Sequence, residues 1–359
     1  MKLMDPQRVW PMSRGKGVKI AVIDSGVSDR SDVMGDGKVT SLKNLTHEHG
    51  DATCDQNGHG TVVGAIISAR EAKKEKLPYY GMAPDSTLMS VKILRDTEQM
   101  SDGKVVAGLI ADGINASIDA GADIINISAA APNTAELKAA VKRAQKKDVL
   151  LVVAAGNKDQ NGNQGAEYPA AYASKHKTYP ALLAVSSATP DNVVSNKSNI
   201  GPYVDIAGPG FKPVGPNPNG DGTWVGADTR DDNAFTSFAT PYVTGTAALV
   251  KARYPGMGGA EIATRITKTA EHPAGGRDEG VGYGMVDPYR AVTADLDPHD
   301  ARKPGDVAGF STGGDPQSMS RMIAALVAAF VVVLAIAIAV GRSVFPRARR
   351  RKRELAAGE

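Results

Sequence analysis

The chain has 359 residues, of which 42% are hydrophobic and 23% are charged, a composition that is typical of globular proteins and excludes wholesale disorder. Its formal net charge of +3 comes from residues 342–359, which hold seven basic and two acidic side chains. The rest of the chain is almost neutral, so we expect no nucleic-acid partner. With Cys54 as its single cysteine, the chain cannot form an intrachain disulfide.

Short apolar runs alternate with helical patterns between residues 15 and 294. The runs predict strands at 18–23, 88–94, 123–127, 149–154, 182–186 and 204–207. The patterns predict helices at 61–69, 105–120, 135–147, 237–253 and 259–269. The strands are rich in β-branched residues and almost continuously apolar, as in a parallel sheet that is covered on both faces. The sequence therefore predicts one doubly wound α/β domain with a mostly parallel sheet and helices on both faces.

The segment VKIAVIDSGVSD places Asp24 at the end of an apolar strand. Functional groups in open α/β sheets gather at the carboxyl ends of the strands, so Asp24 is positioned to orient a partner. An aspartate at such a position also caps turns, and for this segment alone that interpretation is the more common one.

Two further segments carry candidate chemistry. In NGHGTVVGAIISA, His59 lies between two glycines at the start of a helix, which suits an accessible imidazole or a simple turn. In FTSFATPYVTGTAALV, Ser237 opens an apolar helix, where unpaired N–H groups stabilise an oxyanion or the hydroxyl caps the helix. The order Asp24, His59, Ser237 is one of the known orders of a catalytic triad, and the three together are far more specific than any one.

On these motifs the chain resembles the subtilisin-like (S8) serine peptidases over about residues 9–294. DSGV, HGT and TSFATP resemble the aspartate, histidine and serine motifs, and SNIGPYVDIAGPG resembles another family segment. VVAAGN, which ends in Asn157, resembles the segment whose asparagine completes the oxyanion hole. The resemblance implies a subtilisin-like fold and a serine endopeptidase in which Ser237 is the nucleophile, His59 the general base and Asp24 its orienting partner. It implies no metal and no other cofactor.

The resemblance also implies that the substrate pairs in an extended conformation with residues 127–132, where Ser128, Ala129 and Ala130 are the candidate substrate-binding residues. The family usually has Ser-Leu-Gly there, so Ala130 adds a methyl group where substrate approaches. The family also has glycine before its Thr-Ser pair. Phe235 at that position is expected to narrow the cleft or to strain a backbone that prefers glycine geometry.

A membrane anchor is predicted near the C-terminus. Residues 322–340 read MIAALVAAFVVVLAIAIAV, without a charge, proline or glycine, and a basic run follows them. As a helix they would span about 28 Å, close to the hydrocarbon thickness of a bilayer. A buried core helix is the alternative, but core helices are rarely apolar on every face. The basic run predicts a single-pass protein of the bacterial cell membrane, with the catalytic domain extracytoplasmic and the C-terminus cytoplasmic.

The expected domains are an N-terminal extension (1–14), a peptidase domain (15–296), a flexible linker (297–318), a transmembrane helix (319–341) and a basic cytoplasmic tail (342–359). Export requires a signal, yet residues 1–23 contain no apolar signal-peptide core. We therefore expect that this sequence begins downstream of a signal peptide or is a processed form.

Within the family, TSFATPYVTG, the short linker, the single span and the basic tail resemble the mycosins, the membrane peptidases of bacterial type VII secretion. This resemblance implies a peptide or protein substrate and association with the type VII secretion membrane complex. The alternative is a weakly active or inactive subtilisin-fold protein with a structural role in that complex.

The sequence also contains residues that could suit two other kinds of site. His47, His49, Cys54 and His59 lie close in sequence and offer zinc ligands, but their spacing matches no standard zinc pattern. The glycine-rich stretches 220–226 and 280–287 do not connect a strand to a helix as a dinucleotide site requires, so both are predicted to be loops.

Overall fold

A computed structural model describes residues 4–46, 49–72, 79–94, 103–159, 161–189, 191–211, 213–220, 224–226 and 234–296. The predicted linker, transmembrane helix and basic tail lie outside these residues. Among the helices that are described, none is both long and apolar enough to cross a membrane.

The centre of the domain is a seven-stranded sheet in the order β2-β3-β1-β4-β5-β6-β7, in which every pairing is parallel. The strands are β1 (Lys19–Asp24), β2 (Val39–Asn44), β3 (Thr87–Lys92), β4 (Ile124–Ile127), β5 (Leu150–Ala154), β6 (Leu182–Ala188) and β7 (Ile206–Pro209). The prediction of a parallel α/β sheet is confirmed. It missed β2, because this edge strand reads VTSLKN, with few apolar residues, and only Val39 in it is buried.

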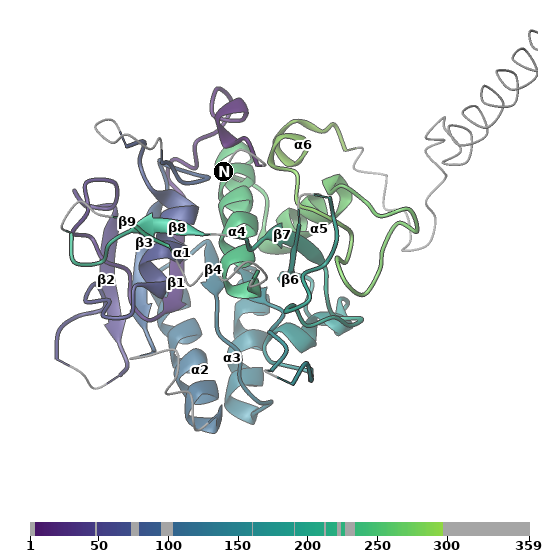
Figure 1. Ribbon diagram of the computed structural model, residues 1–359, viewed down its shortest axis with the longest axis horizontal. Coiled ribbons are helices and arrows are strands. Elements are labelled where there is room, and N and C mark those ends of the chain that lie inside the picture. The colour runs from purple at the N-terminus through teal and green to yellow at the C-terminus, as the bar shows by residue number, and fades with distance from the viewer. Residues whose placement is uncertain are drawn as a thin grey trace, which may run out of the picture. The chain divides into compact units, whose positions relative to one another are not determined.

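Helices cover both faces of the sheet, which explains why the strands are apolar on both sides. Ile20 and Val22 of β1 belong to one apolar core, whereas Ala21 and Ile23 belong to the other. The first core is shared with α1 (His59–Ser68), α4 (Thr236–Arg253), α5 (Gly259–Thr269) and α6 (Pro288–Thr293). The second is shared with α2 (Gly103–Asp119) and α3 (Ala135–Lys146), which lie side by side on their face of the sheet (Figure 1).

Short elements complete the described part of the domain. They are the 3-10 helices η1 (Pro6–Arg8) and η2 (Ala170–Lys175) and the antiparallel pair β8 (Val214–Pro216) and β9 (Trp224–Gly226). The prediction of a loop over 220–226 is wrong for its last three residues, which pair with β8 because an adjacent extended segment satisfies their backbone groups. At the N-terminus, Trp10 is buried and its indole Nε1 donates to the carbonyl oxygen of Met82 at 3.0 Å, so the residues before the first strand pack on the domain.

Candidate active site

The candidate site lies at the carboxyl ends of β1 and β4, where the strand order reverses. The chain adds β2 and β3 on one side of β1 and β4 to β7 on the other, and such a switch point opens a crevice for ligands. Asp24 is the last residue of β1, and Ser128 follows the end of β4. Because Ile23 pairs with Ile127, Asp24 and Ser128 emerge at the same level of the sheet.

A buried carboxylate and a histidine meet at this edge. The Asp24 side chain has no exposed surface, and its Oδ1 lies 2.7 Å from Nδ1 of His59 and accepts from the Ser25 N–H at 2.7 Å. Burial by itself lowers the pKa of His59. The charge of Asp24, its hydrogen bond and the charge of Asp55 outweigh burial, so the pKa of His59 is raised above its ordinary value of 6.5. The imidazole is thereby held by Nδ1, and it is stabilised when it takes up a proton.

Asp55 holds the loop that carries His59, and the sequence analysis did not single it out. Its side chain is 5% exposed. Oδ1 accepts from the Gly58 N–H and the Ser25 hydroxyl, both at 2.9 Å, and Oδ2 accepts from the Thr61 N–H at 2.8 Å. Burial raises its pKa while these hydrogen bonds lower it in part. An aspartate in a polar loop looks solvated in a sequence, so only the contacts identify its role.

The glycine after His59 is required by the close approach of α1 to the end of β1. A Cβ atom at Gly60 would overlap the carbonyl oxygen of Gly26 and would lie 3.1 Å from Oδ1 of Asp24. Backbone atoms cannot move aside as the end of a flexible side chain can, so a larger residue must displace His59 from Asp24.

We therefore expect Gly60→Ala to lower kcat/KM on a peptide substrate about 100-fold, because a shift of about 1 Å in a catalytic group has an effect of this size. The matched control is Gly108→Ala, since a Cβ atom at that helical glycine meets nothing within 4 Å. Gly108→Ala should leave kcat/KM unchanged and raise the free energy of unfolding by up to about 1 kcal/mol. Equal kcat/KM values for Gly60→Ala and Gly108→Ala would contradict the close approach of α1 to the end of β1.

Ser237 lies in the first turn of α4 and is 9% exposed. Pro241 has no N–H to donate to the carbonyl oxygen of Ser237, four residues earlier. The Ser128 hydroxyl fills this place and donates to that oxygen at 2.9 Å. Within the described residues nothing accepts from the Ser237 N–H, as is usual in the first turn of a helix. The ring of Phe238, next in the chain, lies 4.8 Å from the His59 ring, so His59 packs against the start of α4.

The residue before the Thr-Ser pair is not strained. Phe235 caps α4 with φ −86° and ψ 146°, an extended conformation open to any residue. The prediction of a backbone that needs glycine is therefore wrong. The turn before Ser237 is instead stabilised by a side chain, because the Thr236 N–H donates to Oδ1 of Asn157 at 3.0 Å.

The side-chain amide of Asn157 is oriented by these contacts. Its Oδ1 accepts from both the N–H and the hydroxyl of Thr236. Since Oδ1 faces Thr236, Nδ2 is directed to the other side of the amide, and no described residue accepts from it. Thus Asn157 and the Ser237 N–H each bring an unused donor to the start of α4.

A buried polar chain beneath Ser237 was also absent from the prediction. The Thr244 hydroxyl donates to Oδ1 of Asn126 at 2.8 Å, and Nδ2 of Asn126 donates to the Ser128 hydroxyl at 3.0 Å. Ser128 then donates to the Ser237 carbonyl oxygen. This chain ties the end of β4 to α4, and no local sequence signal reveals it, because its members are up to 118 residues apart.

The predicted substrate-pairing edge is shorter than expected. Ile127 is already paired with neighbouring strands, and Ala131 exchanges both of its backbone hydrogen bonds with Tyr168, each at 2.9 Å. The edge that remains is Ser128, Ala129 and Ala130. Ala129 is buried and Ala130 is partly exposed beside a cavity.

The residues weighed as alternative zinc ligands do not assemble among the residues that the structure covers, which hold no group of three or more His, Cys, Asp or Glu side chains suited to a metal ion. His59 contacts Asp24, and His47 lies outside the described residues.

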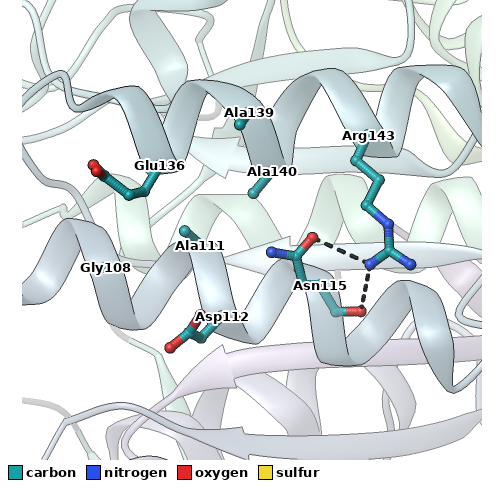
Figure 2. A pocket seen from close by; sticks show the side chains of 8 residues that line it. All are labelled: Gly108, Ala111, Asp112, Asn115, Glu136, Ala139, Ala140 and Arg143. Carbon is teal, nitrogen blue, oxygen red and sulfur yellow. Dashed lines mark hydrogen bonds between the residues drawn. The ribbon is translucent and has the colours of Figure 1, made fainter.

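A separate hollow of about 500 Å³ lies between α2 and α3, on the face of the sheet opposite to α1 and α4 (Figure 2). Its Arg143 guanidinium donates to the backbone oxygen and Oδ1 of Asn115, at 3.2 and 3.1 Å. Asp24, His59 and Ser237 do not line it.

A parallel α/β domain with a buried Asp–His pair beside a serine at a helix N-terminus has the layout of a serine peptidase. The sequence model of the subtilase family (Peptidase S8) matches residues 15–284, and the chain belongs to this family. It is a subtilisin-like serine endopeptidase.

Its relatives include the mycosins. Mycosin-4 of Mycobacterium tuberculosis is 33% identical over 336 residues, which cover 86% of this chain and 71% of mycosin-4. The crystal structure of MycP1 with the N-terminal propeptide removed is similar with a TM-score of 0.71 at 32% identity, covering 82% of this chain and 96% of that one. A chain in the structure of an intact ESX-5 inner membrane complex is similar with a TM-score of 0.69 at 29% identity, covering 97% of this chain and 89% of that one.

Proposed function

We propose that this protein is a membrane-anchored serine endopeptidase that hydrolyses peptide bonds through Asp24, His59 and Ser237. The observation that carries the proposal is the 2.7 Å contact between Nδ1 of His59 and the buried Asp24 carboxylate, with the imidazole packed against the turn that holds Ser237. Because Asp24 engages Nδ1, Nε2 is the ring nitrogen that would serve the serine hydroxyl.

In the proposed acylation step, Ser237 Oγ attacks the carbonyl carbon of the scissile peptide bond while Nε2 of His59 takes its proton. Asp24 keeps the proton on Nδ1 and stabilises the imidazolium that forms. The C–N bond then breaks, and the imidazolium gives its proton to the leaving amine. In the second half, His59 takes a proton from water, the hydroxide attacks the acyl-enzyme, and the proton returns to Ser237 as the acid leaves.

The negative charge that develops on the carbonyl oxygen is proposed to be held by the Ser237 N–H and Nδ2 of Asn157. Both donors are without an acceptor among the described residues, and the Thr236 contacts orient the asparagine amide. Donors held in this way need no rearrangement during the reaction, which is the main source of their effect. The extended substrate would pair with Ser128, Ala129 and Ala130.

We also propose that the peptidase domain comprises residues 15–296, after an N-terminal extension, residues 1–14. In this proposal a linker over 297–318 joins it to a transmembrane helix over 319–341, and residues 342–359 form a basic cytoplasmic tail. The apolar run 322–340 supports the span, and the basic residues after it support a catalytic domain outside the bacterial cell membrane. The similarity to a chain of the ESX-5 inner membrane complex supports association with a type VII secretion complex.

The proposal is tested with a fluorophosphonate probe, which reacts with activated serines. The full chain should be labelled at Ser237, and Ser237→Ala should abolish the label in a protein with an unchanged unfolding midpoint. If the folded wild-type chain is not labelled, the catalytic proposal fails, and the structural role in a secretion complex becomes the better interpretation.

The oxyanion donor has its own test. Asn157→Ala should lower kcat roughly 10²–10³-fold with little change in KM, because the donor acts on charge that exists only in the transition state. The exposed Asn161 serves as a matched control, and Asn161→Ala should leave kcat unchanged. A change confined to KM would argue against a role at the oxyanion.

A further inference from the structure

A cavity of about 310 Å³ adjoins the proposed substrate-pairing edge. Ala130 and Ala131 form one wall, and Val106 of α2 contributes apolar surface. Every other lining side chain is alanine, proline or the hydrogen of glycine, except for Glu167. Among the described residues, Glu167 is thus the only charged or polar side chain that lines the cavity.

The Glu167 carboxylate lies directly behind the proposed oxyanion donor. A Cβ atom at Gly156, the residue before Asn157, would lie 2.6 Å from Cδ of Glu167, so the carboxyl group rests on the Gly156 backbone. On its other side, Glu167 is fixed next to the edge, because Tyr168 is paired with Ala131. The carboxylate therefore closes the space between Ala130 and Asn157.

This carboxylate has no hydrogen-bond or ion-pair partner among the described residues. Burial raises its pKa to about 7, and no cation of the described residues offsets that effect. The titratable group that faces it is Tyr203, whose pKa is raised by burial and then by the charge of Glu167. Tyr203 directs its hydroxyl to the carbonyl oxygen of Ala155 at 3.3 Å and leaves Glu167 unpaired.

We propose that Glu167 selects substrates with a lysine or arginine side chain on the residue whose carbonyl group Ser237 attacks. The inference rests on the proposed function. In the proposed complex, the carbonyl oxygen of that substrate residue lies at Asn157, and the substrate backbone runs along Ser128 to Ala130. The side chain of the same substrate residue then enters the space between Asn157 and Ala130, which Glu167 closes. A half-buried carboxylate in apolar surroundings is stabilised by an ammonium or guanidinium group.

The selectivity depends on pH with a defined sign. Below its pKa of about 7, Glu167 is neutral and attracts a cation weakly; above it, the carboxylate is charged. The preference for lysine should therefore grow as the pH rises through about 7. The protonation of His59 also changes with pH, but it affects all substrates alike, so the ratio of two substrates at each pH removes its contribution.

The experiment compares two tetrapeptide 4-nitroanilides that differ only in the last residue, lysine or methionine, on the full chain between pH 5.5 and 9. The ratio of kcat/KM for lysine over methionine should rise across this range. Glu167→Gln should lower the ratio at pH 8.5 roughly tenfold to hundredfold and remove its pH dependence, since hydrogen bonds between charged groups have effects of this size. Glu136→Gln removes the charge of an exposed glutamate in α3 that does not line this cavity, so it is the matched control and should change neither.

A binding measurement separates this inference from the proposed catalysis. Ser237→Ala should bind the lysine peptide more tightly than the methionine peptide, and Ser237→Ala/Glu167→Gln should lose the difference. That result without any hydrolysis by the wild-type chain would uphold the role of Glu167 and refute the triad. Hydrolysis with the same ratio in wild type and Glu167→Gln, or equal or undetectable binding of both peptides, overturns the inference. Glu167→Lys provides a second check, because it should invert the preference toward a glutamate peptide.

Discussion

Ser237→Ala should lower kcat on a peptide substrate roughly 10⁶-fold, the largest effect of any single substitution in this protein. The hydroxyl is the only group lost, and it is the proposed nucleophile that forms the acyl-enzyme. KM should change little, because Ser128, Ala130 and the cavity beside them remain. Stopped assays with a 4-nitroanilide peptide at high enzyme concentration measure a loss of this size.

The control is Ser174→Ala, which removes an exposed serine hydroxyl whose one described hydrogen bond is to the carbonyl oxygen of Ala171. It should retain full activity. The double variant Ser237→Ala/His59→Ala gives a sharper test, because residues that act as one unit are not additive. It should be no slower than Ser237→Ala alone. A further large loss in the double variant would mean that His59 acts independently of Ser237 and would contradict the triad.

Asp24→Asn should lower kcat/KM roughly 10⁴-fold while it leaves the shape of the site intact. The asparagine side chain can turn its NH₂ group toward Nδ1 of His59. Nδ1 then becomes the acceptor, and the proton moves to Nε2. An imidazole in that tautomer cannot take the proton of Ser237, so the general base is lost although His59 is still present.

The pH profile of the same variant carries a second prediction. His59 must be neutral to act as a base, so kcat/KM rises with pH through the His59 pKa, which in the wild type is raised above 6.5. In Asp24→Asn the burial that lowers this pKa remains, while the charge and hydrogen bond of Asp24, which raise it, are gone. The midpoint of the acidic limb should therefore move to lower pH.

Asp29→Asn is the matched control, because Asp29 is an exposed aspartate five residues further along the chain. It should change neither the maximum rate nor the midpoint. A residual activity in Asp24→Asn with the midpoint unmoved would show that the 2.7 Å contact does not govern the protonation of His59, and it would contradict the assignment of Asp24 as the orienting group.

The sequence by itself determined those features that depend on the local pattern of consecutive residues, such as strands, helices and short motifs. Asp24, His59 and Ser237 could be named as candidates because each stands at the boundary of a strand or helix, within a short stretch whose apolar pattern is strong. The parallel sheet was predicted because β1, β4, β5 and β6 are apolar on both faces, which only a doubly covered sheet requires. The apolar run 322–340 is of the same kind, and it remains a prediction because it lies outside the described residues.

The tertiary structure decided every feature that depends on contacts between distant segments. Asp55 and Asn126 look like ordinary polar residues until their partners, Thr61 and Thr244 among them, are in place. Phe235 departs from the family pattern, yet its extended backbone is unstrained, and this depends on dihedral angles that the residue type does not specify. Glu167 is the clearest example of a residue whose role the sequence does not reveal, since it is one acidic residue in a polar stretch of sequence. Only the approach of Gly156 and the pairing of Tyr168 with Ala131 bring its carboxylate to the edge where a substrate would bind, because chain packing, not sequence proximity, sets those distances.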